Sequence, residues 1–250
     1  MEIIEIKLSV TNCFLIRNQR NYVMVDTGYE YDWDLFRKRL TEAAVGLQEI
    51  SHIILTHHHD DHCGLLHKIL EVNGSICVVL SHQAESLLLK GENDRTHGGG
   101  LLNKRVEFLI GLKQLYLSLV LKKPVNKENN LKFKPYKTRD NDIKIIGETR
   151  LGDIGIDLTG KIIETPGHTI DSISIVFEDG DCIAGDAAAN FLRFAGTKYC
   201  VIFVTDIREY YRSWEKLISH KVRRIFPAHG KPFAVEKLVQ NIGKIKPGKS

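Results

Sequence analysis

Short apolar segments bounded by turn residues alternate with segments of helical periodicity along most of the chain. Apolar runs rich in Val and Ile predict strands, and apolar positions at spacings of three and four predict helices. The predicted strands are 2–8, 12–17, 22–25, 48–55, 75–80, 143–146, 149–151, 161–164, 173–177, 182–184 and 224–226. The predicted helices are 32–45, 65–72, 82–90, 101–121, 207–219 and 233–242. Two halves that each alternate strands and helices indicate the α/β class.

The pattern changes between residues 91 and about 141, which separate the two halves. The three glycines at 98–100 interrupt the chain, and the helix expected at 101–121 is too charged to span a bilayer. The stretch 122–139 has seven basic residues and one acidic residue. We therefore expect one domain over 1–250 with a helical insertion at about 91–141. Either a solvated excursion or a lid facing the substrate explains this insertion.

Composition places the chain in the ordinary globular class. With 250 residues, 43% hydrophobic and 26% charged, it is long enough to bury a sizeable core. A net charge of +4 is too small to indicate a nucleic-acid partner. The five cysteines are odd in number and lack CxxC spacing, which argues against a disulfide framework. No secretory signal is visible. We expect a cytoplasmic protein with a small-molecule substrate and no membrane partner; the oligomeric state stays open.

One stretch, Thr56–Gly64, concentrates candidate chemistry. Its positions 57–62 hold four histidines and two aspartates directly after the apolar run Ile53–Leu55. In an extended backbone alternate side chains share a face, so His57 and His59 point the same way. The next residues enter a helix and reach a second point a short distance away. Two sets of donors at two neighbouring points indicate two metal ions.

Three further candidate ligands stand beside glycines at the ends of predicted strands. Strands of one sheet that end at the same edge would bring them to the histidine cluster. Neutral imidazoles and carboxylates are the ligands of catalytic zinc sites. Zinc is favoured for the two divalent transition metals, with iron or manganese as alternatives. The expected partition is His57, His59 and His168 for the first metal, Asp61, His62 and His229 for the second, and Asp186 bridging both.

The remaining histidines and nearby polar residues are assigned other roles. His58 is expected beside the site without binding metal, and Cys63 is expected to be a core thiol. Asp26, at the end of a strand before a glycine, is expected to support the site or brace the turn. Isolated histidines are more often hydrogen-bonded structural residues than ligands. This applies to His52, His67, His82, His97 and His220.

These motifs together resemble the metallo-β-lactamase superfamily. The resemblance rests on His57-x-His59-x-Asp61-His62, Thr165-Pro166-Gly167-His168, Gly185-Asp186 and Pro227-Ala228-His229-Gly230, in that order. Asn12–Ile16 and Val25–Gly28 are similar to the opening of that family. The resemblance implies a four-layer αββα sandwich with the metals at the sheet edge. It covers roughly residues 1–90 and 143–235 and does not account for the insertion.

The resemblance and the metal ligands imply a dinuclear metal-dependent hydrolase. A metal-bridging hydroxide would cleave an ester, thioester, lactone or similar bond, and Asp61 would steer it as a catalytic residue. A phosphodiesterase or nuclease, or a catalytically inactive metal-binding regulator, remains as an alternative. His59 argues against the redox branch of the family, where a glutamate usually replaces it. The tyrosine that lactonases carry shortly after the bridging aspartate has no counterpart in Ala187–Asn190.

Overall fold

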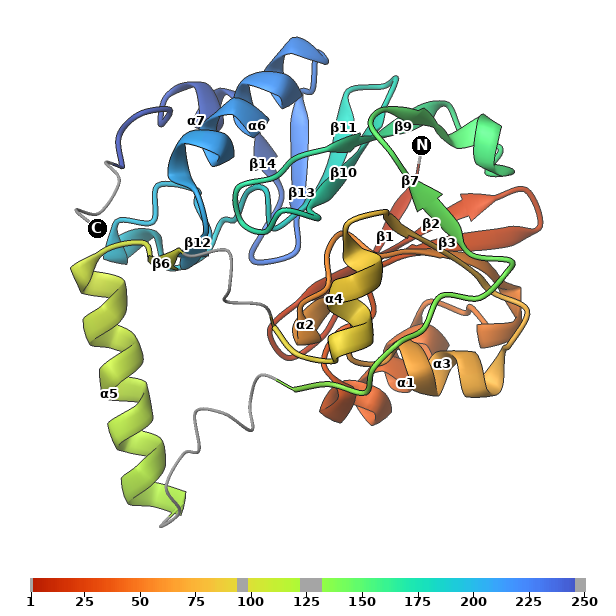
Figure 1. Cartoon of the computed structure of the whole chain (residues 1–250), viewed down its shortest axis with the longest axis horizontal. Coiled ribbons are helices and arrows are strands. Elements are labelled where there is room, and N and C mark those ends of the chain that lie inside the picture. Colours follow the sequence, from red (N-terminus) through yellow and green to blue (C-terminus); the bar gives the residue numbers. More distant parts are fainter. Residues whose placement is uncertain (1, 94–98, 122–131, 246–250) are drawn as a thin grey trace.

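The chain folds into two six-stranded β-sheets that pack face to face, with helices on both outer faces (Figure 1). The computed structural model describes residues 2–93, 99–121 and 132–245, except for the side chains of 113–121. This is the four-layer αββα sandwich that the resemblance implied. Residues from before and after the predicted insertion build it together. The expectation of a single domain over 1–250 stays a prediction.

The first sheet is built almost wholly from the first half of the chain. Its strands, in spatial order, are β1 (Ile3–Lys7), β2 (Asn12–Asn18), β3 (Asn21–Val25), β4 (Ile50–Ile54), β5 (Cys77–Ser81) and β7 (Ile143–Ile145). The helices of this half are α1 (Trp33–Glu42), α2 (Asp60–Cys63), α3 (Leu66–Val72) and α4 (Ala84–Lys90). Strands β3, β4, β5 and β7 run parallel, so their carboxyl ends meet at one edge of the sheet.

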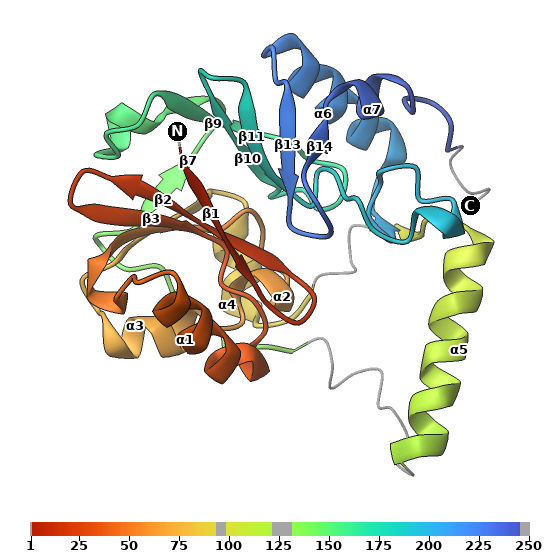
Figure 2. The same cartoon turned by 180° about the vertical axis from the view of Figure 1, so that it is seen from behind.

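The second sheet comes from the second half. Its strands, in spatial order, are β14 (Phe233–Ala234), β13 (Arg224–Pro227), β11 (Asp181–Gly185), β10 (Ile173–Phe177), β9 (Gly160–Glu164) and β8 (Thr149–Arg150). Helices α6 (Ile207–Ser219) and α7 (Glu236–Val239) cover its outer face (Figure 2). Strands β11 and β13 pair in parallel, so two more carboxyl ends lie side by side.

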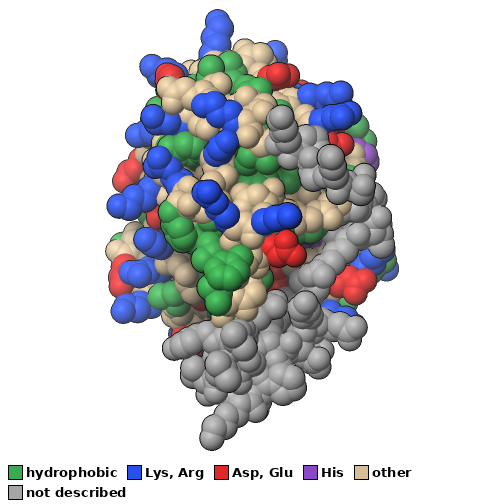
Figure 3. Space-filling view, turned by 90° about the vertical axis from the view of Figure 1, so that its left-hand side faces the viewer, with side chains coloured by type: hydrophobic (Ala, Val, Ile, Leu, Met, Phe, Trp, Pro, Cys, Tyr) green, Lys and Arg blue, Asp and Glu red, His purple; other side chains and the backbone are tan. Residues whose placement is uncertain are grey.

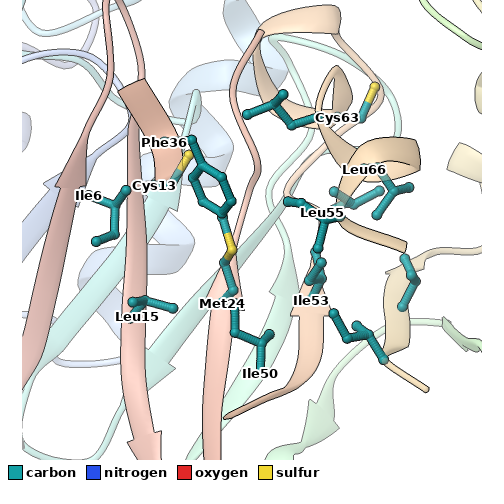
Figure 4. Packing of buried hydrophobic residues seen from close by; sticks show 14 of the residues in the cluster. Ile6, Cys13, Leu15, Met24, Phe36, Ile50, Ile53, Leu55, Cys63 and Leu66 are labelled. Atoms are coloured by element: carbon teal, nitrogen blue, oxygen red, sulfur yellow. The ribbon is translucent and has the colours of Figure 1, made fainter. Parts of the chain in front are cut away.

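Alternate residues of each strand enter different hydrophobic cores, as the two-residue period of a strand requires. On β4, Ile53 packs toward the helices of the first half, whereas Ile54 packs into the core between the sheets. Figure 4 shows the helix-side core, where Phe36 and Leu66 meet side chains of the strands. Each sheet is therefore buried on both faces, which explains why the strands read as continuous apolar runs.

Helix α6 connects the second core to the sheet edge. The Asp206 side chain caps it by accepting hydrogen bonds from the backbone N–H groups of Arg208 and Glu209, at 2.8 and 3.2 Å. Its fully buried Tyr210 hydroxyl donates to the carbonyl oxygen of Asp186, at 2.9 Å. Trp214 Nε1 donates to the carbonyl oxygen of Ala187, at 2.7 Å. The helix thereby holds the end of β11.

The predicted insertion is only partly a separate excursion. Residues 94–98 and 122–131, which include most of the basic stretch, lie outside the described residues. Strand β6 (Gly100–Leu101) pairs with β12 (Phe203–Val204), and helix α5 (Lys104–Leu121) projects from that point (Figures 1 and 2). The last part returns to the body, because Phe133 is buried in the first core and its N–H donates to Gly91 O.

The prediction of a helix at 233–242 is wrong at its beginning. Phe233 and Ala234 form β14, which pairs antiparallel with β13, and α7 covers only Glu236–Val239. Pairing with a neighbouring strand overrides the local helical pattern of this segment. Within the described part of the chain, no helix combines the length and apolar character needed to cross a bilayer. All five cysteines are free thiols.

Candidate metal centre

All seven predicted ligands meet at one edge of the sandwich. His57 and His59 follow β4, and Asp61 and His62 lie on α2, whereas the other three come from the second half. The parallel strands explain this convergence, because their carboxyl ends share one edge. The remaining ligands are His168 in the loop after β9, Asp186 directly after β11 and His229 directly after β13.

Three imidazoles form what we call the first ligand group: His57, His59 and His168. Their ligating nitrogens lie within 4.8 Å of one another. His168 Nε2 lies 3.2 Å from His57 Nε2 and 3.0 Å from His59 Nδ1. The rings of His57 and His59 are 4.7 Å apart, as expected for alternate residues of an extended segment. Three nitrogens thus converge on one point.

The second ligand group consists of Asp61, His62 and His229, whose ligand atoms also lie within 4.8 Å of one another. Asp61 Oδ2 lies 3.7 Å from His62 Nε2 and 3.3 Å from His229 Nε2. The Thr11 hydroxyl donates to the same carboxylate oxygen, at 3.3 Å. Side chains from both halves of the chain therefore complete this group.

Asp186 lies between the two groups and presents one carboxylate oxygen to each. Its Oδ1 lies 3.6 Å from His62 Nε2 and 3.3 Å from His229 Nε2. Its Oδ2 lies 3.4 Å from His168 Nε2. This is the placement that a bridging carboxylate requires. That these seven residues bind metal stays a prediction.

The two groups differ in their protonation. Burial, reinforced by neighbouring imidazoles, lowers the pKa values of His57 and His59 well below the ordinary value, so both rings are neutral at pH 7. Burial acts in the same direction on His62, but Asp26, Asp61 and Asp186 outweigh it and raise the pKa of His62 to about 9. The pKa of His229 is raised in the same way by Asp186 and Asp61, against its burial.

Two polar atoms test whether metal ions suit this arrangement. Among the described residues, His62 Nε2 and Asp186 Oδ1 are the buried side-chain atoms without a hydrogen-bond partner. Such atoms are rare in folded proteins, because an unpaired buried polar group is costly. Both atoms face the point where the second group converges. A donor set of imidazole nitrogens and carboxylate oxygens is what divalent transition metals bind, so the residues fit such ions.

A family model described as the metallo-β-lactamase superfamily matches residues 6–229. The match spans both halves of the chain and includes all seven candidate ligands. The chain belongs to the metallo-β-lactamase superfamily.

Relatives within the superfamily have similar sequences over part of their length. A β-lactamase-like protein 2 homolog of Drosophila melanogaster is 33% identical over 91 residues, covering 34% of this chain and 25% of the relative. Its counterpart in Caenorhabditis elegans is 21% identical over 241 residues, covering 94% of this chain and 60% of the relative. The chain thus spans less than two thirds of both relatives.

Solved structures of superfamily members have the same fold. A family protein from Thermus thermophilus matches with a TM-score of 0.65 at 17% identity, over 97% of this chain and 78% of that one. A subclass B3 metallo-β-lactamase of Bradyrhizobium japonicum matches with a TM-score of 0.64 at 17% identity, over 97% and 87%. At such identities the likeness shows the fold alone.

Asp26 supports the site of this superfamily member, as the sequence analysis favoured. Its Oδ2 accepts a hydrogen bond from His62 Nδ1, at 2.8 Å. The N–H and the hydroxyl of Thr56 also donate to its carboxylate, each at 2.8 Å. Because Nδ1 carries the donated proton, Nε2 of His62 is left to face the ligand group.

Backbone carbonyls orient two other ligands of this metallo-β-lactamase fold. His168 Nδ1 donates to the carbonyl oxygen of Phe203, at 2.9 Å, and His229 Nδ1 donates to that of Val10, at 3.1 Å. Phe203 lies on β12, which pairs with β6 of the predicted insertion. The insertion therefore contributes to the placement of His168, which the sequence did not indicate.

Two glycines allow the ligand-bearing loops to approach their neighbours. Gly167 has φ +126, and a Cβ there would lie 2.4 Å from the backbone of Tyr210. Gly185 has φ +52, and a Cβ there would lie 2.6 Å from Thr56 Cβ. Each glycine directly precedes a predicted ligand, so the superfamily motifs Gly-His and Gly-Asp have a steric reason here.

Two positioning residues escaped the sequence analysis. Asp171 accepts hydrogen bonds from the N–H and Nδ1 of His58, both at 2.9 Å, and both side chains are buried. His58 thus points away from the first ligand group, as expected. Asn93 Oδ1 accepts from the N–H of Asp60, and its Nδ2 donates to the Asp60 carboxylate, both at 2.9 Å. Nothing in the local sequence marks Asn93, because its role depends on where the insertion begins.

The described histidines that were assigned structural roles lie in other contacts. His52 is half-buried beside Ser51, and His82 Nδ1 is 3.2 Å from the carbonyl oxygen of Ile145. His67 and His220 lie 3.4 and 3.5 Å from glutamate oxygens. His97 lies outside the described residues. Cys63 is a buried thiol that donates to the carbonyl oxygen of His58, as predicted.

Proposed function

We propose that this protein is a dinuclear metal-dependent hydrolase that cleaves an ester, thioester, lactone or similar bond of a small-molecule substrate. Membership of a superfamily that is generally hydrolytic supports the reaction class. Two divalent transition ions are proposed as cofactors, zinc in the first place and iron or manganese as alternatives. When bound, such ions lower the pKa of water toward about 7 and stabilise negative charge on a substrate oxygen.

The position of Asp186 carries this proposal. Its two oxygens face different ligand groups at 3.3–3.6 Å, and one of them has no hydrogen-bond partner within the described chain. A structural zinc site is closed by four protein ligands around one ion. Here each ion would have three ligands of its own and only a share of the Asp186 carboxylate, so neither would be closed by four ligands of its own and water could bind. An arrangement of this kind favours catalysis over a purely structural role.

The surrounding protein prepares the ligands for this task. The imidazoles of the first ligand group are neutral because they are buried, so they need not lose a proton to bind a cation. Although burial opposes ionisation, His62 and His229 lower the pKa of Asp61 below its ordinary value, so its carboxylate is charged. Asp61 is proposed to bind metal and to steer the attacking hydroxide.

Aromatic side chains lie near the centre. The ring of Phe191 lies 6.5 Å from that of His229 and is 43% exposed. Burial, together with the carboxylates of Asp61 and Asp60, raises the pKa of Tyr29, so its phenol stays protonated. Tyr29 stacks on Tyr31, with ring centroids 4.8 Å apart. We propose that these rings contact the non-reacting part of a substrate.

The test combines metal analysis with a hydrolysis screen. The full chain, reconstituted with zinc or manganese, should bind close to two ions and hydrolyse at least one of an ester, thioester, lactone or β-lactam panel. Asp186→Asn removes the charge shared by both ions, and activity should fall about 10²-fold or more with weakened binding of at least one ion. His220→Ala is the matched control, since this histidine lies near Glu148 and away from the centre.

Three results would contradict the proposal. Protein that binds no metal after reconstitution would exclude the centre. Two bound metals with no hydrolysis of any bond would favour an inactive regulator. Cleavage of a phosphodiester substrate added to the screen, with no cleavage of the other substrates, would favour the nuclease alternative.

A further inference from the structure

Large apolar side chains are exposed on two segments that meet where the insertion joins the second half. Eleven large hydrophobic residues are exposed among those described, and five of them belong to residues 99–112 and 191–204. Phe194 and Phe108 are the most exposed of the five, at 75% and 65%. We call these five the apolar platform: Leu101, Phe108, Leu112, Phe191 and Phe194. A soluble surface rarely gathers so many without a partner.

Hydrogen bonds hold the two segments of the platform together. Strand β6 pairs with β12, and the N–H of Leu102 donates to the carbonyl oxygen of Ile202 at 2.9 Å. The Asn103 side chain caps α5 by accepting from the N–H groups of Arg105 and Val106, both at 3.0 Å. The buried Val106 anchors the first turn of the helix. The exposed side chains are therefore held on an ordered base.

Cations surround the platform. Lys104, Arg105, Arg193 and Lys198 are all exposed, whereas Glu107 is the one acidic residue in the two segments. Within the described residues, none of these four cations has a carboxylate within salt-bridge distance. In Figure 3, which faces the side where α5 begins, apolar side chains lie among Lys and Arg side chains. Lys198 donates to the carbonyl oxygen of Lys244 and Arg193 lies over the Tyr199 ring, so both keep their charge. Exposed apolar groups beside cations that no described carboxylate neutralises match an anionic lipid surface.

Helix α5 begins at the platform and carries two of its side chains, Phe108 and Leu112. Its 18 residues correspond to about 27 Å, and it projects from the platform in both Figure 1 and Figure 2. It is long enough to cross a bilayer but not apolar enough, because it carries four charged residues.

We propose that the apolar platform docks on a membrane surface rich in anionic phospholipid. A second copy of the chain that docked through the same surface is disfavoured, because its cations would face the same cations. A nucleic acid would pair with the cations but would leave Leu101 and Leu112 without an apolar partner. The proposal departs from the expectation of no membrane partner. That expectation rested on the sequence, which does not show that these apolar side chains are exposed.

The platform adjoins the metal centre. Phe191 of the platform lies beside the His229 ring, and Phe203, paired with Leu101, accepts the hydrogen bond of His168. A bilayer docked on the platform would therefore lie on the same side of the molecule as the centre. Docking itself does not require metal or catalysis, so it can be tested independently of the proposed function.

The test is sedimentation of the full chain with vesicles of phosphatidylcholine alone or mixed with phosphatidylserine. The chain should pellet with the mixed vesicles, and salt should weaken this binding. The double variant F108S/F194S should bind about tenfold or more weakly, since two phenylalanines lose apolar contact. The matched control is Ile146→Ser, which is 72% exposed and follows β7 away from the platform.

Reversal of charge tests the electrostatic contribution to vesicle binding. Lys104→Glu with Arg105→Glu should remove the preference for phosphatidylserine without changing metal content. The proposal is overturned if the chain stays in the supernatant with mixed vesicles, or if F108S/F194S pellets like the parent. It is also overturned if light scattering shows a dimer that F108S/F194S dissociates, or if the platform variants lose binding to a labelled RNA and not to vesicles.

Discussion

Asp26 offers the sharpest test of how a residue that does not bind metal orients one that does, His62. Its buried carboxylate accepts three hydrogen bonds of 2.8 Å, one from His62 Nδ1 and two from Thr56. In Asp26→Asn, the amide nitrogen replaces one acceptor oxygen. Either the His62 bond is lost, or the imidazole shifts its proton to Nε2, where it blocks metal binding.

The expected loss of metal affinity in Asp26→Asn can be bounded from these contacts. Removing a group that orients a metal-binding histidine typically lowers metal affinity about 10- to 100-fold, or about 1.4–2.7 kcal/mol. The loss should fall on the ion held by the second ligand group, since His62 belongs to it. The first ligand group has no hydrogen bond to Asp26 and should keep its affinity.

Competition with a chromophoric chelator measures both affinities. Asp32→Asn is a matched control, because Asp32 is also a buried aspartate and accepts a hydrogen bond from Ser9 Oγ at 2.8 Å, outside the ligand groups. It should leave both affinities unchanged even if it lowers stability. If Asp26→Asn binds two ions as tightly as the parent, the supporting role assigned to Asp26 is refuted.

Three other predictions follow from the geometry. The pKa of His62 is about 9, so a metal that binds there must displace a proton. The zinc affinity of the second ligand group should therefore fall as the pH drops below about 9, whereas the affinity of the first group should persist to lower pH. Chelator competition across pH measures both affinities, and an equal pH dependence of the two would contradict the prediction. Asn93→Ala removes both hydrogen bonds to Asp60 and should lower the affinity of the second ligand group for its ion about tenfold. An unchanged affinity would show that Asn93 does not support the metal centre. Gly167→Ala forces a Cβ to 2.4 Å from Tyr210 at φ +126 and should cost at least about 2 kcal/mol in the free energy of unfolding; a parental denaturation midpoint would contradict this.

Local pattern was sufficient for most of the fold. The strands of both sheets except β14 were predicted within a few residues, because most of them are short runs of Val, Ile and other apolar residues between turn residues. The prediction of the last helix was wrong at its beginning, because pairing with Ile225 stabilises Phe233 more than local helical contacts would. A strand at the edge of a sheet depends on its neighbour, which periodicity does not record.

The sequence by itself determined which side chains assemble at the sheet edge. Four of the seven stand within six positions, and the others stand beside glycines at strand ends, so chain geometry limits where they can point. Only the tertiary structure decided what surrounds them. Asn93, Asp171 and Phe203 reach the centre through contacts between segments distant in the chain, and their residue types are common everywhere. The exposure of Phe108 and Phe194 is equally a property of packing, because an apolar residue carries no local signal of whether another element will cover it.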